Sequence, residues 1–201
     1  MNSKYIISNI FKPEDRKKDR IEKEIFLNQK AKVIWLTGLS GSGKSSIAIN
    51  LKRKLKEKGF FIYVLDGDEV RNGINNNLSF SEIDRKENIR RIAEVSKLFV
   101  GNGIITINCF ISPTEEIRKM SRKIIGDDYI EVFINAPLDV CEKRYPKGLD
   151  QKAREGEIKN FTGIDSPYDE PENPDLVLYT DKYNVMECAN QLEEFILPLI
   201  R

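Results

Sequence analysis

The segment VIWLTGLSGSGKS, residues 33–45, decides the fold of this chain. Its first part, 33–37, is apolar or β-branched and predicts a buried strand. The part from Gly38 to Ser45 fills the pattern G-x-x-x-x-G-K-[ST]. A helix is predicted directly after it, because Ile47, Leu51 and Leu55 recur at i, i+4 and i+8. A strand, this loop and a helix in that order indicate a phosphate-binding loop.

Such a loop holds an anion mainly through its backbone. Glycines let N–H groups turn inward around a phosphate, and the helix N-terminus adds the positive end of its dipole. In this pattern Lys44 contacts the β- and γ-phosphates of ATP, and Ser45 offers its hydroxyl to Mg²⁺. A glycine-rich turn without a ligand is the other interpretation, and the two flanking elements weigh against it. The predicted nucleotide-binding residues are Gly38, Leu39, Ser40, Gly41, Ser42, Gly43, Lys44 and Ser45.

Outward from this segment, β-rich runs alternate with helical periodicity. Such alternation predicts βαβ units, and hence an α/β, three-layer P-loop fold with a mostly parallel sheet. We expect a charged N-terminal arm at 1–32, followed by a kinase domain at 33–201. The arm is either solvated and partly helical, or it serves in regulation or in a dimer contact. Further strands are predicted at 60–65, 104–111, 129–135 and 175–179, and further helices from Ser81, at 114–125, from Pro137 and at 184–197.

One stretch, about 145–174, breaks this rhythm. It carries Lys147, Lys152, Arg154 and Lys159 with little apolar periodicity. A loop-rich insertion of that length within a compact domain is uncommon unless it is functional. The stretch is therefore interpreted as a basic lid.

Composition narrows the function classes. The formal net charge of +1, from 33 basic and 32 acidic residues, provides no overall field for nucleic acid or an anionic membrane. Histidine is absent, so proton transfer must rest on Asp, Glu, Lys or water. Cys109, Cys141 and Cys188 are scattered, and no signal peptide or membrane-spanning run is apparent, so a cytoplasmic protein is expected. With no N-K-x-D guanine signature, a kinase of a small metabolite is favoured.

Two carboxylates follow the second predicted strand, in Asp66-Gly67-Asp68. Open α/β sheets bind ligands at the carboxyl ends of their strands. Asp66 could hold Mg²⁺, and Asp68 could accept the proton of a substrate hydroxyl. An isolated D-G-D is more often a tight turn, but its place beside the phosphate loop favours a functional role.

Several longer runs occur in a fixed order: D-G-D-E-V-R at 66–71, D-R-K-E-N-I-R-R at 84–91, F-I-S-P at 110–113, P-K-G-L at 146–149 and G-E-I-K-N-F-T-G-I-D at 156–165. Together they closely resemble the adenylyl-sulfate kinase family, from about Val33 to Thr180. The resemblance implies an enzyme that uses ATP and Mg²⁺ to phosphorylate the 3′-hydroxyl of adenylyl sulfate (APS), giving 3′-phosphoadenylyl sulfate (PAPS). It also implies a homodimer and a place in sulfate assimilation.

The resemblance further implies an acceptor site. Arg71 and Arg85 can meet phosphate and sulfate oxygens, and Phe80 and Phe161 can sandwich an adenine, although either ring alone would more often be core packing. Lys147 would close over the transferring group. The implied acceptor residues are Asp68, Arg71, Phe80, Arg85, Asn88, Ile111, Ser112, Lys147 and Phe161.

In the family, the serine of F-I-S-P is the annotated phosphoserine, which places Ser112 among the catalytic candidates with Lys44 and Asp68. Direct attack by a hydroxyl needs no covalent intermediate, and a helix N-cap before Pro113 is the structural alternative for Ser112.

The chain departs from the usual family pattern at Glu69, Asn72, Tyr145 and Asp150. An extra carboxylate at position 69 would disfavour an anionic acceptor unless it is neutralised. Two alternatives therefore stay open. One is a related kinase that acts on cytidine diphosphoramidate, and the other is a P-loop regulator that binds nucleotide without turnover.

Overall fold

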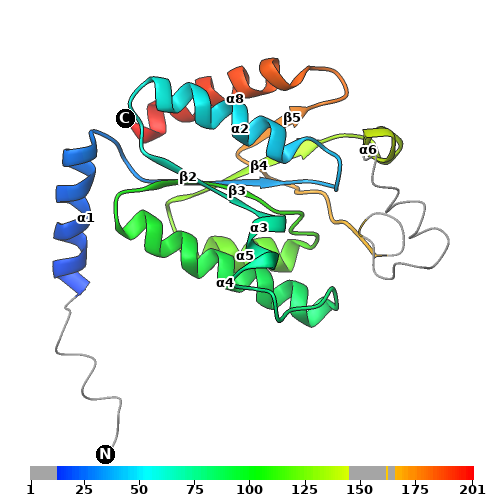
Figure 1. The fold of residues 1–201 in the computed structure, drawn as a ribbon, viewed down its shortest axis with the longest axis horizontal. Helices are drawn as coiled ribbons and strands as arrows, with labels where there is room; N and C mark the ends of the chain where they lie inside the picture. The colour runs from blue at the N-terminus through cyan, green and yellow to red at the C-terminus, as the bar shows by residue number, and fades with distance from the viewer. Residues whose placement is uncertain (1–12, 145–161, 163–165) are drawn as a thin grey trace, which may run out of the picture.

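The computed structural model of this 201-residue chain describes residues 13–144, 162 and 166–201. Within these ranges a five-stranded sheet lies at the centre of the molecule, with helices on both faces (Figure 1). All neighbouring strands pair in parallel, in the order β2-β3-β1-β4-β5. This confirms the predicted three-layer α/β fold. The strands are β1 Val33–Thr37, β2 Ile62–Asp66, β3 Ile105–Cys109, β4 Tyr129–Asn135 and β5 Leu176–Tyr179.

The helices divide between the two faces of the sheet. α2 (Lys44–Glu57) and α8 (Val185–Ile200) cover one face, and α4 (Glu82–Gly101) and α5 (Glu115–Ile125) cover the other (Figure 1). Each face has its own core: Ile47 and Leu192 belong to the first, and Trp35 and Ile92 to the second. Burial of these apolar side chains fixes the layers, because it removes their surface from water. The remaining helices are α1 (Pro13–Leu27), α3 (Gly67–Asn72) and α6 (Leu138–Arg144).

Strand order decides where a ligand can bind. β1 is buried along its whole length and lies between β3 and β4. The chain leaves β1 toward β2 on one side of the sheet and later crosses to β4 on the other. The carboxyl end of β1, where the phosphate loop begins, is therefore a topological switch point, the usual ligand site of an open α/β sheet.

Local signals account for the helix starts. The side chain of Ser81 caps α4 by accepting from Asp84 N, and Asn184 begins α8 with a full capping box that includes Glu187. Thr114 caps α5. The expectation that Pro137 opens its helix is close, since α6 begins one residue later, at Leu138.

One helix was not predicted. D-G-D is not the tight turn that was the alternative to a functional role, because a short helix, α3, begins at Gly67, and Asp66 is its N-cap. The Asp66 side chain accepts from Asp68 N, so a local side-chain bond starts the helix where the apolar pattern shows no periodicity.

Helix α1 lies at the opposite end of the sheet from α6 (Figure 1). Arg20 Nη1 contacts Asp128 Oδ2 at 2.6 Å, and Gln29 Nε2 donates to the carbonyl of Gly103 over 2.7 Å. The described part of the arm is thus helical and attached to the body, while the proposed boundary at residue 32 stays a prediction. Among the described helices, none is long and apolar enough to cross a membrane.

Candidate active site

The loop after β1 presents its backbone to a ligand. Gly43, with φ of 102°, is the N-cap of α2, and it contributes no side-chain hydrogen bond to the first turn. The first amides of that helix therefore remain for an anion. Gly41, with φ of 77°, packs so closely on α6 that a Cβ there would lie 2.5 Å from the carbonyl oxygen of Cys141. Only glycine fits this position.

Lys44 is buried inside the loop. Its Nζ donates to the carbonyls of Gly38 at 2.9 Å and Leu39 at 2.6 Å, and it lies 3.4 Å from Ser42 Oγ. All three partners are uncharged, and burial lowers the pKa of the ammonium to about 8. A buried cation with neutral partners is a strong attractor for an anion in the loop.

Ser45 and Asp66 bring two oxygens together beside the loop. Ser45 Oγ donates to Asp66 Oδ2 over 2.7 Å, although the two residues come from α2 and β2. No group of three or more acidic, cysteine or histidine side chains able to hold a metal occurs among the described residues. A hydroxyl and one carboxylate fit Mg²⁺, which takes few protein ligands and completes its shell with water and phosphate oxygens.

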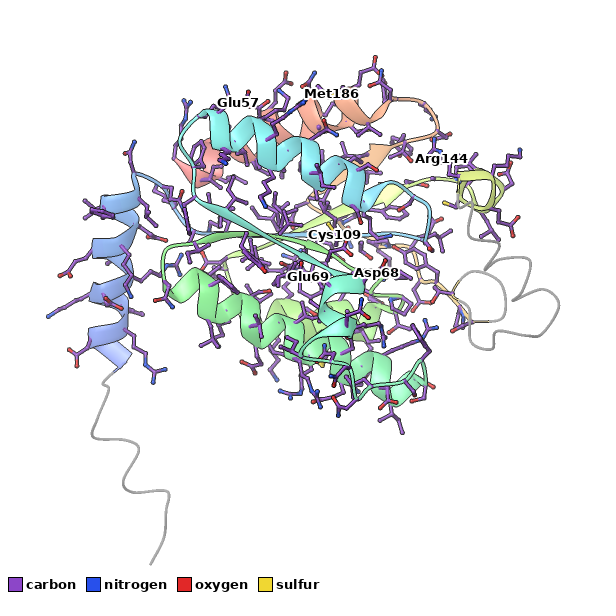
Figure 2. The ribbon with its side chains drawn as sticks, in the orientation of Figure 1. Glu57, Asp68, Glu69, Cys109, Arg144 and Met186 are labelled. Carbon is purple, nitrogen blue, oxygen red and sulfur yellow. The ribbon has the colours of Figure 1, made fainter. Side chains whose placement is uncertain are left out.

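Asp68 is exposed in the first turn of α3, beside the carboxyl end of β2 (Figure 2). Glu69 follows it in the chain, but its side chain contacts Tyr63, whose Oη donates to Glu69 Oε1 over 3.4 Å. Asp68 lines the central cavity, whereas Glu69 and Asn72 are outside its lining. Two of the departures from the family pattern thus fall outside the cavity wall. The other two, Tyr145 and Asp150, lie outside the described residues.

Arg71 and Phe80 form one wall of the cavity. The Arg71 guanidinium carbon lies 4.2 Å from the centroid of the Phe80 ring, and Arg71 Nη1 donates to the carbonyl of Ser79 over 3.1 Å. The Phe80 side chain is not core packing, because the residue is 59% exposed. An exposed ring with a cation on it is a surface suited to stacking a flat ligand.

Arg85 and Asn88 come from α4 and line the same wall. Arg85 Nε donates to the carbonyl of Phe80 over 2.9 Å, and its Nη1 donates to Thr162 Oγ1. Asn88 is one of the buried residues of α4. Arg85 therefore connects the turn that bears the Phe80 ring to Thr162, one of the described residues of the expected lid.

Ser112 lies in a strained turn after β3. Its φ of 47° is unusual for a residue other than glycine, and it is 1% exposed. The buried Arg118 holds the turn by donating from Nη1 to the Ser112 carbonyl over 3.0 Å. The N-cap alternative for Ser112 is wrong, because Thr114 caps α5. The turn brings Ile111 and Ser112 into the cavity wall.

A single cavity of about 770 Å³ joins these groups. Gly38, Leu39 and Ser42 shape the loop without lining the cavity, and Lys147 and Phe161 lie outside the described residues. The predicted residues that line it are Ser40, Gly41, Gly43, Lys44, Ser45, Asp66, Asp68, Arg71, Phe80, Arg85, Asn88, Ile111 and Ser112.

Sequence reasoning missed one wall of the cavity, which comes from α6 and from the segment after β5. Arg144, at the end of α6 (Figure 2), donates from Nη2 to the carbonyl of Thr180 over 2.6 Å, and Thr180 Oγ1 donates to the carbonyl of Ser42 over 2.9 Å. Thr180 directly follows β5, so its place at the carboxyl end of a strand was a usable signal. No local signal marks Arg144. The wall also includes Tyr183, Asn184 and Val185.

Cys109 lies at the end of β3 and lines the cavity (Figure 2). Burial raises the pKa of its thiol to about 12. The thiol is therefore neutral at physiological pH and unsuited to act as a nucleophile.

Comparison with known proteins adds an independent observation. A family model described as Adenylylsulphate kinase matches residues 30–179. The adenylyl-sulfate kinase of Bacteroides thetaiotaomicron is 57% identical over 194 residues, 96% of each chain. The structure of Mycobacterium tuberculosis APS kinase CysC in complex with AMPPNP and APS aligns with a TM-score of 0.80 at 49% identity, covering 83% of this chain and 98% of that one. A hexameric APS kinase from Thiobacillus denitrificans aligns with a TM-score of 0.65 at 26% identity, covering 91% of this chain and 31% of that one.

Proposed function

The chain belongs to the adenylylsulphate kinase family, and from this premise we propose that it transfers the γ-phosphoryl group of ATP to the 3′-hydroxyl of adenylyl sulfate. One observation carries the proposal. The phosphate loop and the wall of Asp68, Arg71, Phe80 and Arg85 line the same cavity of about 770 Å³, large enough for two ligands to meet.

On the donor side, the loop amides and Lys44 would bind the phosphates of ATP. The Lys44 ammonium lies within the loop and would exchange its carbonyl partners for phosphate oxygens, which stabilise the charged form more strongly. Arg144, Thr180 and Tyr183 line the same cavity, Thr180 Oγ1 donates to the carbonyl of Ser42 in the loop, and this wall would receive the donor base.

Ser45 and Asp66 would hold Mg²⁺, which when bound supplies charge neutralisation on the transferring phosphates. The 2.7 Å hydrogen bond between Ser45 Oγ and Asp66 Oδ2 supports this assignment, because two oxygens so close together could contact the same ion.

On the acceptor side, Asp68 would accept the proton of the 3′-hydroxyl. The hydroxyl oxygen forms a bond to the γ-phosphorus while the bond between that phosphorus and the β–γ bridging oxygen breaks, so ADP and 3′-phosphoadenylyl sulfate are the products. Asp68 contributes by orienting the attacking oxygen and removing its proton.

Recognition of the acceptor would rest on charge and stacking. Arg71 and Arg85 offer forked donors to phosphate and sulfate oxygens, and the exposed Phe80 ring offers a face to adenine. The proposal also includes Phe161, which would form the second half of an adenine clamp, and Lys147, which would lie on a closing lid. Both lie outside the described residues.

A coupled ADP-release assay tests this function. The wild-type chain would be offered ATP and Mg²⁺ with adenylyl sulfate, cytidine diphosphoramidate or nucleoside monophosphates in parallel, and the product identified by mass spectrometry. We expect 3′-phosphoadenylyl sulfate to form with the highest kcat/KM. Preference for the cytidine compound would identify the related kinase, and nucleotide binding without turnover of any acceptor would identify the regulator.

We also propose a cytoplasmic homodimer. All three cysteines are free thiols, as a reducing compartment maintains them. Helix α1 leaves Ile25 73% and Phe26 88% exposed, and apolar side chains of this size are typical of a contact surface. Light scattering of the purified chain measures the mass directly, and a monomer at micromolar concentration would contradict this part of the proposal.

A further inference from the structure

Two buried asparagines lie at the acceptor wall of the cavity, the wall that carries Arg71, Phe80 and Arg85; Asn88 lines the cavity and Asn75 does not. Asn75 is 0% exposed and belongs to the turn after α3, where its backbone N–H donates to the carbonyl of Val70. Asn88 is 5% exposed, belongs to α4 and lines the cavity. Asn75 Nδ2 donates to Asn88 Oδ1 over 2.9 Å. The turn after α3 thus contacts a predicted acceptor-binding residue from behind.

Arg91 decides which way the Asn75 amide faces. A guanidinium can only donate, and Arg91 Nη1 lies 3.4 Å from Asn75 Oδ1 and 2.9 Å from Asn77 Oδ1. Arg91 is itself held by Glu87, whose Oε1 accepts from Nε over 2.8 Å. The oxygen of Asn75 therefore faces the positive charge, and its NH₂ group faces Asn88.

The orientation of the Asn75 amide in turn sets that of the Asn88 amide. Asn88 turns its Oδ1 toward the Asn75 NH₂ group, which also donates to the Asn88 carbonyl over a longer 3.5 Å, and the Asn88 NH₂ group is left as the other end of the amide. Within ranges 13–144, 162 and 166–201, no atom accepts a hydrogen bond from Asn88 Nδ2. A cavity-lining amide with its donor end unused is suited to an oxygen-rich, anionic ligand.

We propose that Asn75 is a positioning residue for the acceptor: it orients Asn88 so that the Asn88 NH₂ group donates to an oxygen of adenylyl sulfate. Glu87 and Arg91 complete the arrangement by orienting Asn75. The inference rests on the proposed function, because it names how that same site holds its acceptor.

Asn75→Asp tests the orientation with almost no change of shape. A carboxylate between Arg91 and Asn88 can only accept, so Asn88 must turn its NH₂ group toward position 75 and present Oδ1 to the cavity. We expect the KM for adenylyl sulfate to rise about 10- to 100-fold, with the KM for ATP unchanged and kcat within about threefold of wild type. An unchanged KM for adenylyl sulfate would overturn the proposal.

Asn77→Asp is the matched control. It places the same new charge beside the same guanidinium, but Asn77 is exposed, and in the described part of the chain its side chain bonds to Arg91 and not to Asn88. We expect near-wild-type kinetics. An equal rise in the acceptor KM would show that the effect is general repulsion of an anion, and would also overturn the proposal.

A double-mutant cycle adds a measurement that a purely structural role would not satisfy. If Asn75 acts through Asn88, the KM for adenylyl sulfate of Asn75→Ala/Asn88→Ala should match that of Asn88→Ala alone, whereas additive effects would count against the proposal.

Partial unfolding of a variant does not affect this test, because KM does not depend on the folded fraction of the enzyme. If every substitution at position 75 prevents folding, Arg91→Met serves instead. We expect it to raise the KM for adenylyl sulfate and not the KM for ATP, and an unchanged KM for adenylyl sulfate would contradict the proposal. Failure of the wild-type chain to phosphorylate adenylyl sulfate would reject the proposed function, whereas these variants test the asparagine pair.

Discussion

Trp35 Nε1 donates a 2.8 Å hydrogen bond to Ser112 Oγ, and both side chains are buried. An indole can only donate, so the serine oxygen accepts here and keeps its own proton for another partner. The bond links the central strand β1 to the strained turn in the cavity wall. We infer that Ser112, which lines the cavity, serves there as a hydrogen-bond donor, a role that requires no covalent phosphoserine.

Ser112→Ala should therefore reduce kcat by no more than about tenfold, because it removes one hydrogen bond and not a nucleophile. Steady-state kinetics with adenylyl sulfate measure this. Loss of about 10³-fold or more, together with phosphoserine in the wild-type enzyme during turnover, would restore Ser112 as a nucleophile.

Lys44→Ala should lower kcat by roughly 10³-fold or more while the protein stays folded, because it removes the cation that stabilises charge on the transferring group. The fold should persist, since among the described residues the hydrogen-bond partners of the buried ammonium are Gly38, Leu39 and Ser42, all within the loop. Turnover and thermal unfolding would be measured beside Lys52→Ala, an exposed lysine of the same helix. Near-normal turnover by a folded Lys44→Ala protein would be incompatible with the loop mechanism.

The KM for ATP should depend on pH through Lys44. Burial lowers the pKa of this ammonium to about 8 in the free enzyme, and bound phosphates raise it. Below pH 8 the lysine is charged in both states, so the KM for ATP should be flat. Above pH 8 the free enzyme must take up a proton to bind, so the KM should rise by up to about tenfold per pH unit. Lys44→Arg stays charged over this range, and a parallel rise in that variant would assign the titration to another group.

Asp68→Asn should lower kcat far more than it raises the KM for ATP, because an amide keeps the shape of the carboxylate but not its basicity. Glu69→Gln is the matched control, since Glu69 contacts Tyr63 outside the cavity and should behave as wild type. If Asp68→Asn instead weakens only ATP or Mg²⁺ binding, the residue serves the metal and not the acceptor.

Phe80→Ala should raise the KM for adenylyl sulfate by about 10- to 100-fold, as expected for loss of one stacked base, without changing the affinity of the free enzyme for ATP. Ile83→Ala removes a side chain that is 81% exposed and outside the cavity lining, and should have no effect. The same change at Phe161 is expected to act like Phe80→Ala. The wild-type enzyme should also prefer adenylyl sulfate to cytidine diphosphoramidate by about 10²-fold in kcat/KM, and loss of that preference would show that adenine stacking does not govern recognition.

Much of this protein follows from local sequence alone. The apolar run at 33–37, the glycine loop after it, and the caps Ser81, Thr114 and Asn184 predict elements that the structure contains at or within a few residues of the expected bounds. These signals are readable because a strand, a turn or a helix cap depends on residues a few positions apart. These local signals do not predict the short helix α3, because a side-chain hydrogen bond at Asp66 starts it and it has no apolar stripe.

The tertiary structure alone decided how the site is supported. Trp35 meets Ser112 across 77 positions, Arg144 meets Thr180 across 36, and Asn75 meets Asn88 across 13. None of these pairs leaves a periodic trace in the sequence, because each exists only after separate elements have packed together. Local sequence determined the strands, helices and phosphate loop through short-range sterics and apolar periodicity, whereas the orientation of side chains around the cavity was settled by long-range packing and the pairing of buried polar groups.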